Sequence, residues 1–248
     1  MNAAERHKKI LKGLLERSML SVEEISDTFG VSRETARRDL AFLAERKLLC
    51  KVHGGAVAMP RGFEEHFQKR VQAMREEKLA ACRKALPLVR PGDSLFIDSG
   101  TTTLIFAELL REVEDLNILT NSLAIASLLG GRHKVLMLGG WLNVDAAATA
   151  GHGTIVQAGI FSPDHAFLSI GGISLERGFT NFTEDDAGLS RVMVRNAAQS
   201  TVIADHSKFW KNALVQVCPL GDISHLATDR ALPEEFRSTF QQSGVRIL

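Results

Sequence analysis

A run of polar residues, Asp98-Ser99-Gly100-Thr101-Thr102-Thr103, stands between the apolar segment 94–97 and an apolar helical pattern. The free N–H groups at a helix start favour negative charge, and neighbouring hydroxyls can donate to the same anion. A glycine inside the run allows close approach to the backbone. The run therefore indicates an anion site, which suits a phosphate better than a neutral group. An ordinary helix start capped by Ser or Thr would give the same run, so both interpretations stay open.

Polar residues also follow other apolar segments. Such segments are expected to be strands of a parallel sheet, and α/β proteins bind ligands at the carboxyl ends of these strands. Lys208 would give a phosphate its positive partner, while Asn121 or Asp98 would hold sugar hydroxyls. The glycine pair Gly139-Gly140 is equally compatible with a simple turn, and a lone Lys after a strand is more often a surface residue than a ligand. The prediction therefore rests on the occurrence of these residues together at successive strand ends.

A second cluster is basic. Arg33, Arg37 and Arg38 lie in the first two turns of a helical pattern that starts after Ser32. A shorter helix precedes it, begins near Val22 behind an S-x-x-E capping box, and stops at Gly30. Two short helices joined in this way are typical of a helix-turn-helix, whose second helix enters the DNA major groove. On spacing alone, a three-helix interaction module with solvated arginines is the alternative.

The residues that would contact DNA in this interpretation share a polar or basic side chain that can donate to phosphates or base edges. Segment 48–52 is expected to be a short strand, and 53–55 a turn into 56–57, which together would form a wing. The predicted DNA-binding residues are Ser21, Ser32, Arg33, Thr35, Arg37, Arg38, Lys51 and His53.

Alternating apolar and helical patterns indicate how the remainder folds. Short apolar runs predict buried strands, and longer periodic runs predict helices between them, which is typical of a parallel sheet. The expected strands are 94–97, 117–119, 135–138, 166–168 and 201–204. The expected helices are 102–111, 122–129 and 185–199.

Charge supports a division of the chain. The 248 residues carry a net charge of +1, but residues 1–57 contain eleven Lys or Arg against eight Asp or Glu, which leaves the remainder slightly acidic. Residues 58–75 show no sustained period and contain Pro60 and Gly62, as linkers do. We therefore expect an α/β protein with a small winged helix-turn-helix domain (1–57), a linker (58–75) and a larger α/β domain (76–248).

Several function classes find no support in the residues. The chain has neither a G-x-x-x-x-G-K-[ST] loop nor a G-x-G-x-x-G fingerprint, and its histidines lack metal-site spacing. We expect no cofactor and no metal. Three dispersed cysteines fit a reducing compartment, and no apolar run has the length of a membrane helix, so a cytoplasmic location without membrane contact is expected.

The motifs closely resemble the DeoR family of bacterial transcriptional regulators. The segments that carry the resemblance are Ser21-Val22-Glu23-Glu24-Ile25, Phe29-Gly30-Val31-Ser32, Thr35-Ala36-Arg37-Arg38-Asp39-Leu40, Val52-His53-Gly54-Gly55-Ala56-Val57, Phe96-Ile97-Asp98-Ser99-Gly100-Thr101-Thr102, Leu119-Thr120-Asn121-Ser122, Leu138-Gly139-Gly140 and Ala204-Asp205-His206-Ser207-Lys208-Phe209.

The resemblance implies a repressor whose larger domain is similar in fold to ribose-5-phosphate isomerase and senses a phosphorylated sugar or polyol. The residues that would bind this effector are Asp98, Ser99, Gly100, Thr101, Thr102, Thr103, Asn121, Gly139, Gly140, Asp186 and Lys208.

Two positions depart from the family pattern. Ser174 stands where the family often has Asp, and Asp186 where it usually has Glu, which leaves the effector identity open. The segment 206–215 is most similar to glycerol-3-phosphate regulon repressors, so glycerol 3-phosphate is the first expectation. Operator symmetry implies a homo-oligomer, either a dimer or a tetramer. A sugar-phosphate isomerase is the alternative, but we expect a regulator rather than an enzyme.

Overall fold

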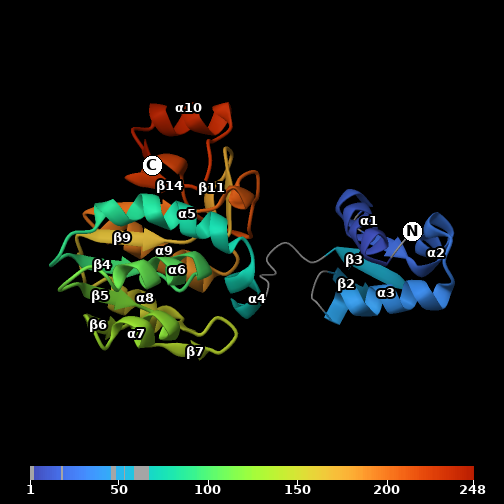
Figure 1. Ribbon diagram of the computed structural model, residues 1–248, viewed down its shortest axis with the longest axis horizontal. Coiled ribbons are helices and arrows are strands. Elements are labelled where there is room, and N and C mark those ends of the chain that lie inside the picture. The colour runs from blue at the N-terminus through green and yellow to red at the C-terminus, as the bar shows by residue number, and fades with distance from the viewer. Residues whose placement is uncertain (1–2, 18, 46–48, 53, 59–66) are drawn as a thin grey trace. The chain divides into compact units, whose positions relative to one another are not determined.

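The computed structural model describes residues 3–17, 19–45, 49–52, 54–58 and 67–248. Two compact units divide between residues 63 and 64 (Figure 1). We refer to them as the N-terminal unit and the C-terminal unit.

The N-terminal unit is a winged helix-turn-helix. Its described residues form a small antiparallel sheet in the order β1-β3-β2 and three helices. These elements are α1 (Ala3–Arg17), β1 (Met19–Ser21), α2 (Val22–Phe29), α3 (Arg33–Glu45), β2 (Leu49–Val52) and β3 (Gly55–Ala58).

Local sequence explains the boundaries of α2. The Ser21 hydroxyl accepts from Glu24 N while the Glu24 carboxylate accepts from Ser21 N, so the predicted capping box is confirmed. The helix ends at Gly30, whose φ of 62° is a left-handed conformation that glycine adopts without strain. Ile10, Ile25 and Leu40 are fully buried between the three helices.

A parallel sheet forms the centre of the C-terminal unit. Within residues 67–248 its strand order is β15-β14-β12-β9-β4-β5-β6, and β9, β4, β5 and β6 are seen side by side in Figure 1. The strands are β4 (Ser94–Ile97), β5 (Asn117–Thr120), β6 (Lys134–Met137), β9 (His165–Leu168), β12 (Gln199–Ile203), β14 (His225–Ala227) and β15 (Arg246–Ile247).

Helices cover both faces of this sheet. The core on one face joins α5, α6 and α7 through residues such as Cys82, Phe106 and Ile125, and the core on the other joins α8 and α9 through Ala158 and Met193. The helices are α4 (Phe67–Gln72), α5 (Arg75–Ala85), α6 (Thr101–Leu110), α7 (Leu123–Leu129), α8 (His152–Ala158), α9 (Glu184–Asn196) and α10 (Glu234–Gln242), with short 3₁₀ turns η1 (Leu86–Leu88), η2 (His206–Lys208) and η3 (Leu220–Asp222).

Two smaller sheets complete the unit. One is antiparallel, in the order β10-β11-β13, and packs with α10 around Phe179 and Phe236. The other is a hairpin of β7 and β8. Their strands are β7 (Trp141–Asn143), β8 (Ala148–Ala150), β10 (Gly172–Ser174), β11 (Gly178–Asn181) and β13 (Val215–Cys218).

The five strands expected from apolar runs all belong to the parallel sheet, within one or two residues of their expected ends. The expected linker differs: α4 and the start of α5 occupy 67–75, and Phe67 is buried. Burial of this aromatic ring stabilises a helix too short to show a period. Residues 59–66 lie outside the described residues. No helix in the described part of the chain has the length and apolarity needed to cross a membrane.

Candidate functional sites

The start of α3 is built to present basic side chains. The Ser32 hydroxyl accepts from Thr35 N at 3.1 Å, which caps the helix. Arg37 and Arg38 are exposed on its first turns. Arg33 pairs with Glu23 of α2 at 2.7 Å, which links the two helices of the motif.

A buried cluster fixes α3 to α1. Arg6 donates to both carboxylate oxygens of Asp39, at 2.5 and 3.0 Å, and His7 Nε2 lies 2.7 Å from Oδ1. Burial raises the pKa of Asp39, but the hydrogen bonds from Arg6 and His7 outweigh it and hold the pKa below its usual value. Sequence reasoning assigned no role to this cluster, because the three residues are joined only by the fold.

The other predicted DNA-binding residues are spread over the unit. Ser21 uses its hydroxyl to cap α2, and Lys51 is exposed on β2 of the wing. His53 lies outside the described residues. The DNA-binding assignment of these residues stays a prediction.

In the C-terminal unit, Asp98 organises the loop between β4 and α6. Its carboxylate accepts from Gly100 N, from the Thr103 hydroxyl at 2.6 Å, and from both the backbone N and the hydroxyl of Ser169. Burial raises the pKa of Asp98 to about 6, against the lowering effect of these hydrogen bonds. The predicted ligand residues Asp98 and Thr103 therefore contact each other and shape the loop from within.

The loop leaves the first backbone N–H groups of α6 without a side-chain cap from any described residue. A Cβ on Gly100 would overlap the Ser169 hydroxyl, so only glycine fits where β4 turns into α6. No side chain among the described residues caps α6, so its first N–H groups are not occupied by a side-chain cap. Thr101 and Thr102, both buried, are the first two residues of the helix.

Lys78 brings a buried ammonium to this helix start. Its Nζ donates to the Thr101 hydroxyl at 3.2 Å and to the carbonyl oxygens of Arg70 and Ala73. Burial lowers its pKa to about 8; Asp205 raises the pKa, while the nearby charges of Lys208 and Arg70 lower it further. Lys78 therefore contacts the loop 98–103 through Thr101 and interacts electrostatically with two further cations, Lys208 and Arg70.

Lys78 and Arg70 were missed from the sequence because they precede the first strand. A signal for Lys78 exists: it lies three, four and seven residues before the buried Ala81, Cys82 and Ala85, on the apolar face of α5.

Two buried oxygens near the same strand ends accept no hydrogen bond from any described residue, namely Asn121 Oδ1 and Asp205 Oδ2. Asn121 follows β5, and its amide donates to the Ser99 hydroxyl at 3.2 Å. Asp205 follows β12, and its other oxygen caps η2 by accepting from Ser207 N. Unpaired buried acceptors are costly, which makes both oxygens candidates for ligand hydroxyls.

Two contacts between His206 and Asp229 hold the η2 turn that carries Lys208. His206 donates through its backbone N to Asp229 Oδ1 at 2.7 Å, and its Nδ1 lies 2.8 Å from Oδ2. Asp229 was not singled out from the sequence, because it follows β14, a three-residue strand that the apolar pattern did not predict.

The remaining predicted effector residues have structural partners. Gly139 N donates to Gln157, and Gly140, at a φ of 154°, has no room for a Cβ against Thr154. Asp186 lies in the first turn of α9, where Thr183 Oγ1 donates to its carboxylate at 2.5 Å. Burial raises the pKa of Asp186, while Thr183 and Arg70 lower it, so Arg70 interacts electrostatically with Asp186 as well as with Lys78.

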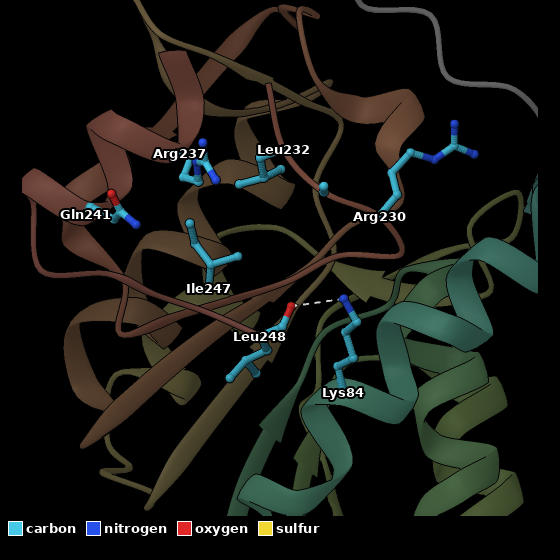
Figure 2. A pocket seen from close by; sticks show the side chains of 8 residues that line it. Lys84, Arg230, Leu232, Arg237, Gln241, Ile247 and Leu248 are labelled. Carbon is cyan, nitrogen blue, oxygen red and sulfur yellow. Dashed lines mark hydrogen bonds between the residues drawn. The ribbon is translucent and has the colours of Figure 1, made fainter. Parts of the chain in front are cut away.

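A separate cavity of about 380 Å³ opens where α5, α10 and β15 meet (Figure 2). Three cations line it, and each has a partner: Lys84 donates to the Leu248 carbonyl, Arg230 pairs with Asp229, and Arg237 pairs with Glu234. None of the predicted effector residues lines this cavity. Among the described residues, no group of His, Cys, Asp and Glu could hold a metal ion.

Comparison with known proteins assigns both units. The family model of the DeoR-like helix-turn-helix domain matches residues 6–61, and that of the DeoR C terminal sensor domain matches residues 73–230. The chain is 32% identical over its full length to the HTH-type transcriptional repressor GlcR of Bacillus subtilis, covering 96% of that protein. It is 30% identical to the glycerol-3-phosphate regulon repressor of Escherichia coli, over 94% of this chain and 93% of the relative.

Solved structures with a similar chain path include a D-ribose-5-phosphate isomerase, at 16% identity and a TM-score of 0.41 over 54% of each chain. The translation initiation factor eIF-2B of Pyrococcus horikoshii OT3 has 15% identity and a TM-score of 0.45, over 92% of this chain and 90% of that one. The family models and the full-length relatives decide the assignment: the chain belongs to the DeoR family of helix-turn-helix transcriptional regulators.

Proposed function

We propose that this regulator represses transcription by holding operator DNA through α3, and that a phosphorylated sugar or polyol releases it. The effector binds at the carboxyl edge of the parallel sheet. The observation that carries the proposal is the buried ammonium of Lys78, which donates to Thr101 at the uncapped start of α6 and interacts electrostatically with Lys208 and Arg70.

The sheet edge offers partners for both the phosphate and the hydroxyl groups of such an effector. A phosphate monoester carries a charge near −2 at neutral pH, which the three cations and the α6 dipole offset. The open acceptors Asn121 Oδ1 and Asp205 Oδ2 suit hydroxyl donors rather than a second anion. A polyol or sugar phosphate has both kinds of group.

Glycerol 3-phosphate is the first candidate. Relatives named glycerol-3-phosphate regulon repressors align over nearly the whole chain, in Escherichia coli at 30% identity and in Haemophilus influenzae at 33%. The segment from His206 to Val215, which carries the resemblance, contains Lys208 on the η2 turn.

Release follows from a population shift. The effector must bind one arrangement of the protein better than the DNA-bound one, because equal affinity for both would leave DNA binding unchanged. A single α3 reads few base pairs, so a homo-oligomer, a dimer or tetramer, presents paired α3 helices to repeated half-sites.

A thermal-shift screen against sugar and polyol phosphates tests the proposal. A ligand at 100 times its Kd stabilises the folded state by about 2.7 kcal/mol. We expect a phosphorylated compound to raise the Tm and its unphosphorylated counterpart to leave it unchanged. Equal shifts from glycerol 3-phosphate and glycerol, with no shift from any other phosphate in the panel, would refute it.

The alternative, a sugar-phosphate isomerase, needs a carboxylate base that can reach the substrate carbon. Asp98 is poorly suited, because Gly100, Thr103 and Ser169 already donate to both of its oxygens. At the other candidate position stands Ser174, whose hydroxyl donates to Asn212 at 2.6 Å. Turnover of ribose 5-phosphate that is lost in Asp98→Asn or Asp186→Asn would overturn the assignment as a regulator.

A further inference from the structure

The hairpin of β7 and β8 exposes large apolar side chains. Trp141 is 85% exposed, Leu142 57% and Val144 78%. Two further apolar side chains are exposed nearby in the sequence, Val156 in α8 at 53% and Ile160, two residues after the end of that helix, at 73%. We call these five residues the hairpin patch.

The two parts of the hairpin patch are joined. A Cβ added to Gly151, which precedes α8, would lie 3.1 Å from Trp141 Cδ1, so the indole sits against the start of that helix. Val156 and Ile160 are one helical turn apart on the exposed side of the same segment. The hairpin part of the patch therefore contacts the start of the segment that carries Val156 and Ile160.

The stretch of sequence that carries the patch has few charged residues. Residues 135–163 contain one charged side chain, Asp145, although Asp, Glu, Lys and Arg make up 24% of the chain. Depletion of charge around exposed aromatic and aliphatic side chains is typical of the centre of a protein interface. Patches of this kind on a surface mark interaction sites.

The outer edge of β7 is also open. β7 pairs with β8 through Trp141 and Ala150, and β8 in turn reaches Ser122, but no described residue pairs with the other side of β7. An apolar strand with an open edge invites association, and proteins normally cover such an edge.

We propose that the hairpin patch is the contact between two copies of this chain, related by a two-fold axis. The extent fits: at roughly 200 Å² or less for each residue, the exposed fractions above offer at most about 700 Å² per copy. Two copies would therefore bury up to about 1,400 Å², which lies within the range of standard specific interfaces. The five side chains of the hairpin patch carry no charge, so they meet their own copies without charge repulsion, as an isologous contact requires. The expectation that two α3 helices act as a pair rests on the proposed function. The exposure of the five patch residues is a structural observation and does not depend on that function.

The alternative, that the hairpin closes as a lid over the effector site, fits the structure less well. The hairpin already faces that site with polar main-chain groups, since Thr149 exchanges hydrogen bonds with Asn121. The groups gathered at the site are charged or polar, so apolar side chains gain little by closing over them.

The test compares molar masses by light scattering over a range of protein concentrations. The double variant Trp141→Glu/Val144→Glu places two negative charges in the patch. The control is Leu214→Glu, which introduces the same residue at an apolar side chain that is 60% exposed but lies outside the patch. We expect an oligomer for the wild type and for the control, and at most half that mass for the double variant. A monomeric wild type, or an unchanged mass for the double variant, overturns the proposal.

Two further readouts keep the result unambiguous. Thermal shift with glycerol 3-phosphate separates this proposal from the sensing function. We expect the double variant to show the same increase in Tm as the wild type. Loss of that increase together with an unchanged molar mass would indicate that the hairpin is a lid over the effector site. If the double variant does not fold, Trp210→Phe leaves Trp141 as the only tryptophan. Its emission is expected to move to longer wavelength on dilution, and emission typical of a water-exposed indole at every concentration refutes the contact.

Discussion

Lys78 Nζ donates to the hydroxyl of Thr101 at 3.2 Å, a bond that joins α5 to the first residue of α6. The same ammonium interacts electrostatically with Asp205 and Lys208, which follow β12. One buried side chain therefore connects the two strand ends at which we place the effector's phosphate.

Replacing Lys78 should weaken effector binding. Loss of a charge-assisted hydrogen bond costs about 1.5–3 kcal/mol, so we expect Lys78→Met to weaken glycerol 3-phosphate binding roughly 10- to 100-fold in titration calorimetry. Lys84→Met, on the exposed side of the same helix, is the control and should bind like the wild type. Equal affinities for Lys78→Met and the wild type would remove Lys78 from the site.

Effector binding should weaken in alkaline solution. Burial lowers the pKa of Lys78 to about 8, and a bound phosphate favours the charged form and raises it. The phosphate itself holds a constant charge above about pH 7. Affinity is therefore full below pH 8 and falls above it, towards tenfold per pH unit. Calorimetry at pH 7 and pH 9 measures this fall, which Lys78→Met should lack; a flat profile in the wild type contradicts it.

The sequence predicted the loop 98–103, Asn121 and Lys208 because strand ends in α/β folds gather ligand groups, and apolar runs mark the strands. Lys78 and Arg70 escaped this search, since they belong to helices that precede β4, the first strand of the parallel sheet along the chain. Ser169 and Asp229 escaped it for a different reason. Their roles depend on pairings across 71 and 23 residues, which local patterns do not encode.

The exposed arginines of α3 should contribute directly to DNA binding. The DNA used is a fragment that the wild-type protein selects from a library. If Arg37 contacts a base, we expect Arg37→Ala to weaken binding to this fragment by about 1–3 kcal/mol. If Arg37 contacts a phosphate, we expect the variant to reduce the salt dependence of binding. Arg111→Ala, an exposed change in the C-terminal unit, is the control. Fluorescence anisotropy at several salt concentrations distinguishes these outcomes. Unchanged binding in both Arg37→Ala and Arg38→Ala would refute the assignment of α3.

Asp39 should act on DNA binding through folding alone. Asp39→Asn leaves the buried Arg6 without its carboxylate, which costs about 3 kcal/mol. We expect faster hydrogen exchange across residues 6–40 in the full chain, together with lost DNA binding and an unchanged thermal shift with glycerol 3-phosphate. Arg37→Ala, by contrast, should exchange like the wild type. Protected amides in Asp39→Asn would show that the cluster contributes little.

The same cluster predicts acid sensitivity of the N-terminal unit. The pKa of Asp39 lies below its ordinary value of 3.8 in the folded state, so its stabilisation is present above about pH 4 and is lost as the pH falls through the folded pKa. Hydrogen exchange of residues 6–40 should accelerate below pH 4 after correction for the intrinsic rate. Asp39→Asn should show no such additional step, and a step of equal size in that variant would place its origin elsewhere.

The most direct test of the account follows release from DNA. The selected DNA fragment, bound to the wild type or to Lys208→Ala, is titrated with the phosphorylated compound that gives the largest thermal shift and with its unphosphorylated counterpart, while anisotropy is recorded. We predict that only the phosphorylated compound releases the wild type and that Lys208→Ala stays bound. Release of both proteins at the same concentration, or release by the unphosphorylated compound, would contradict a phosphate site at this sheet edge.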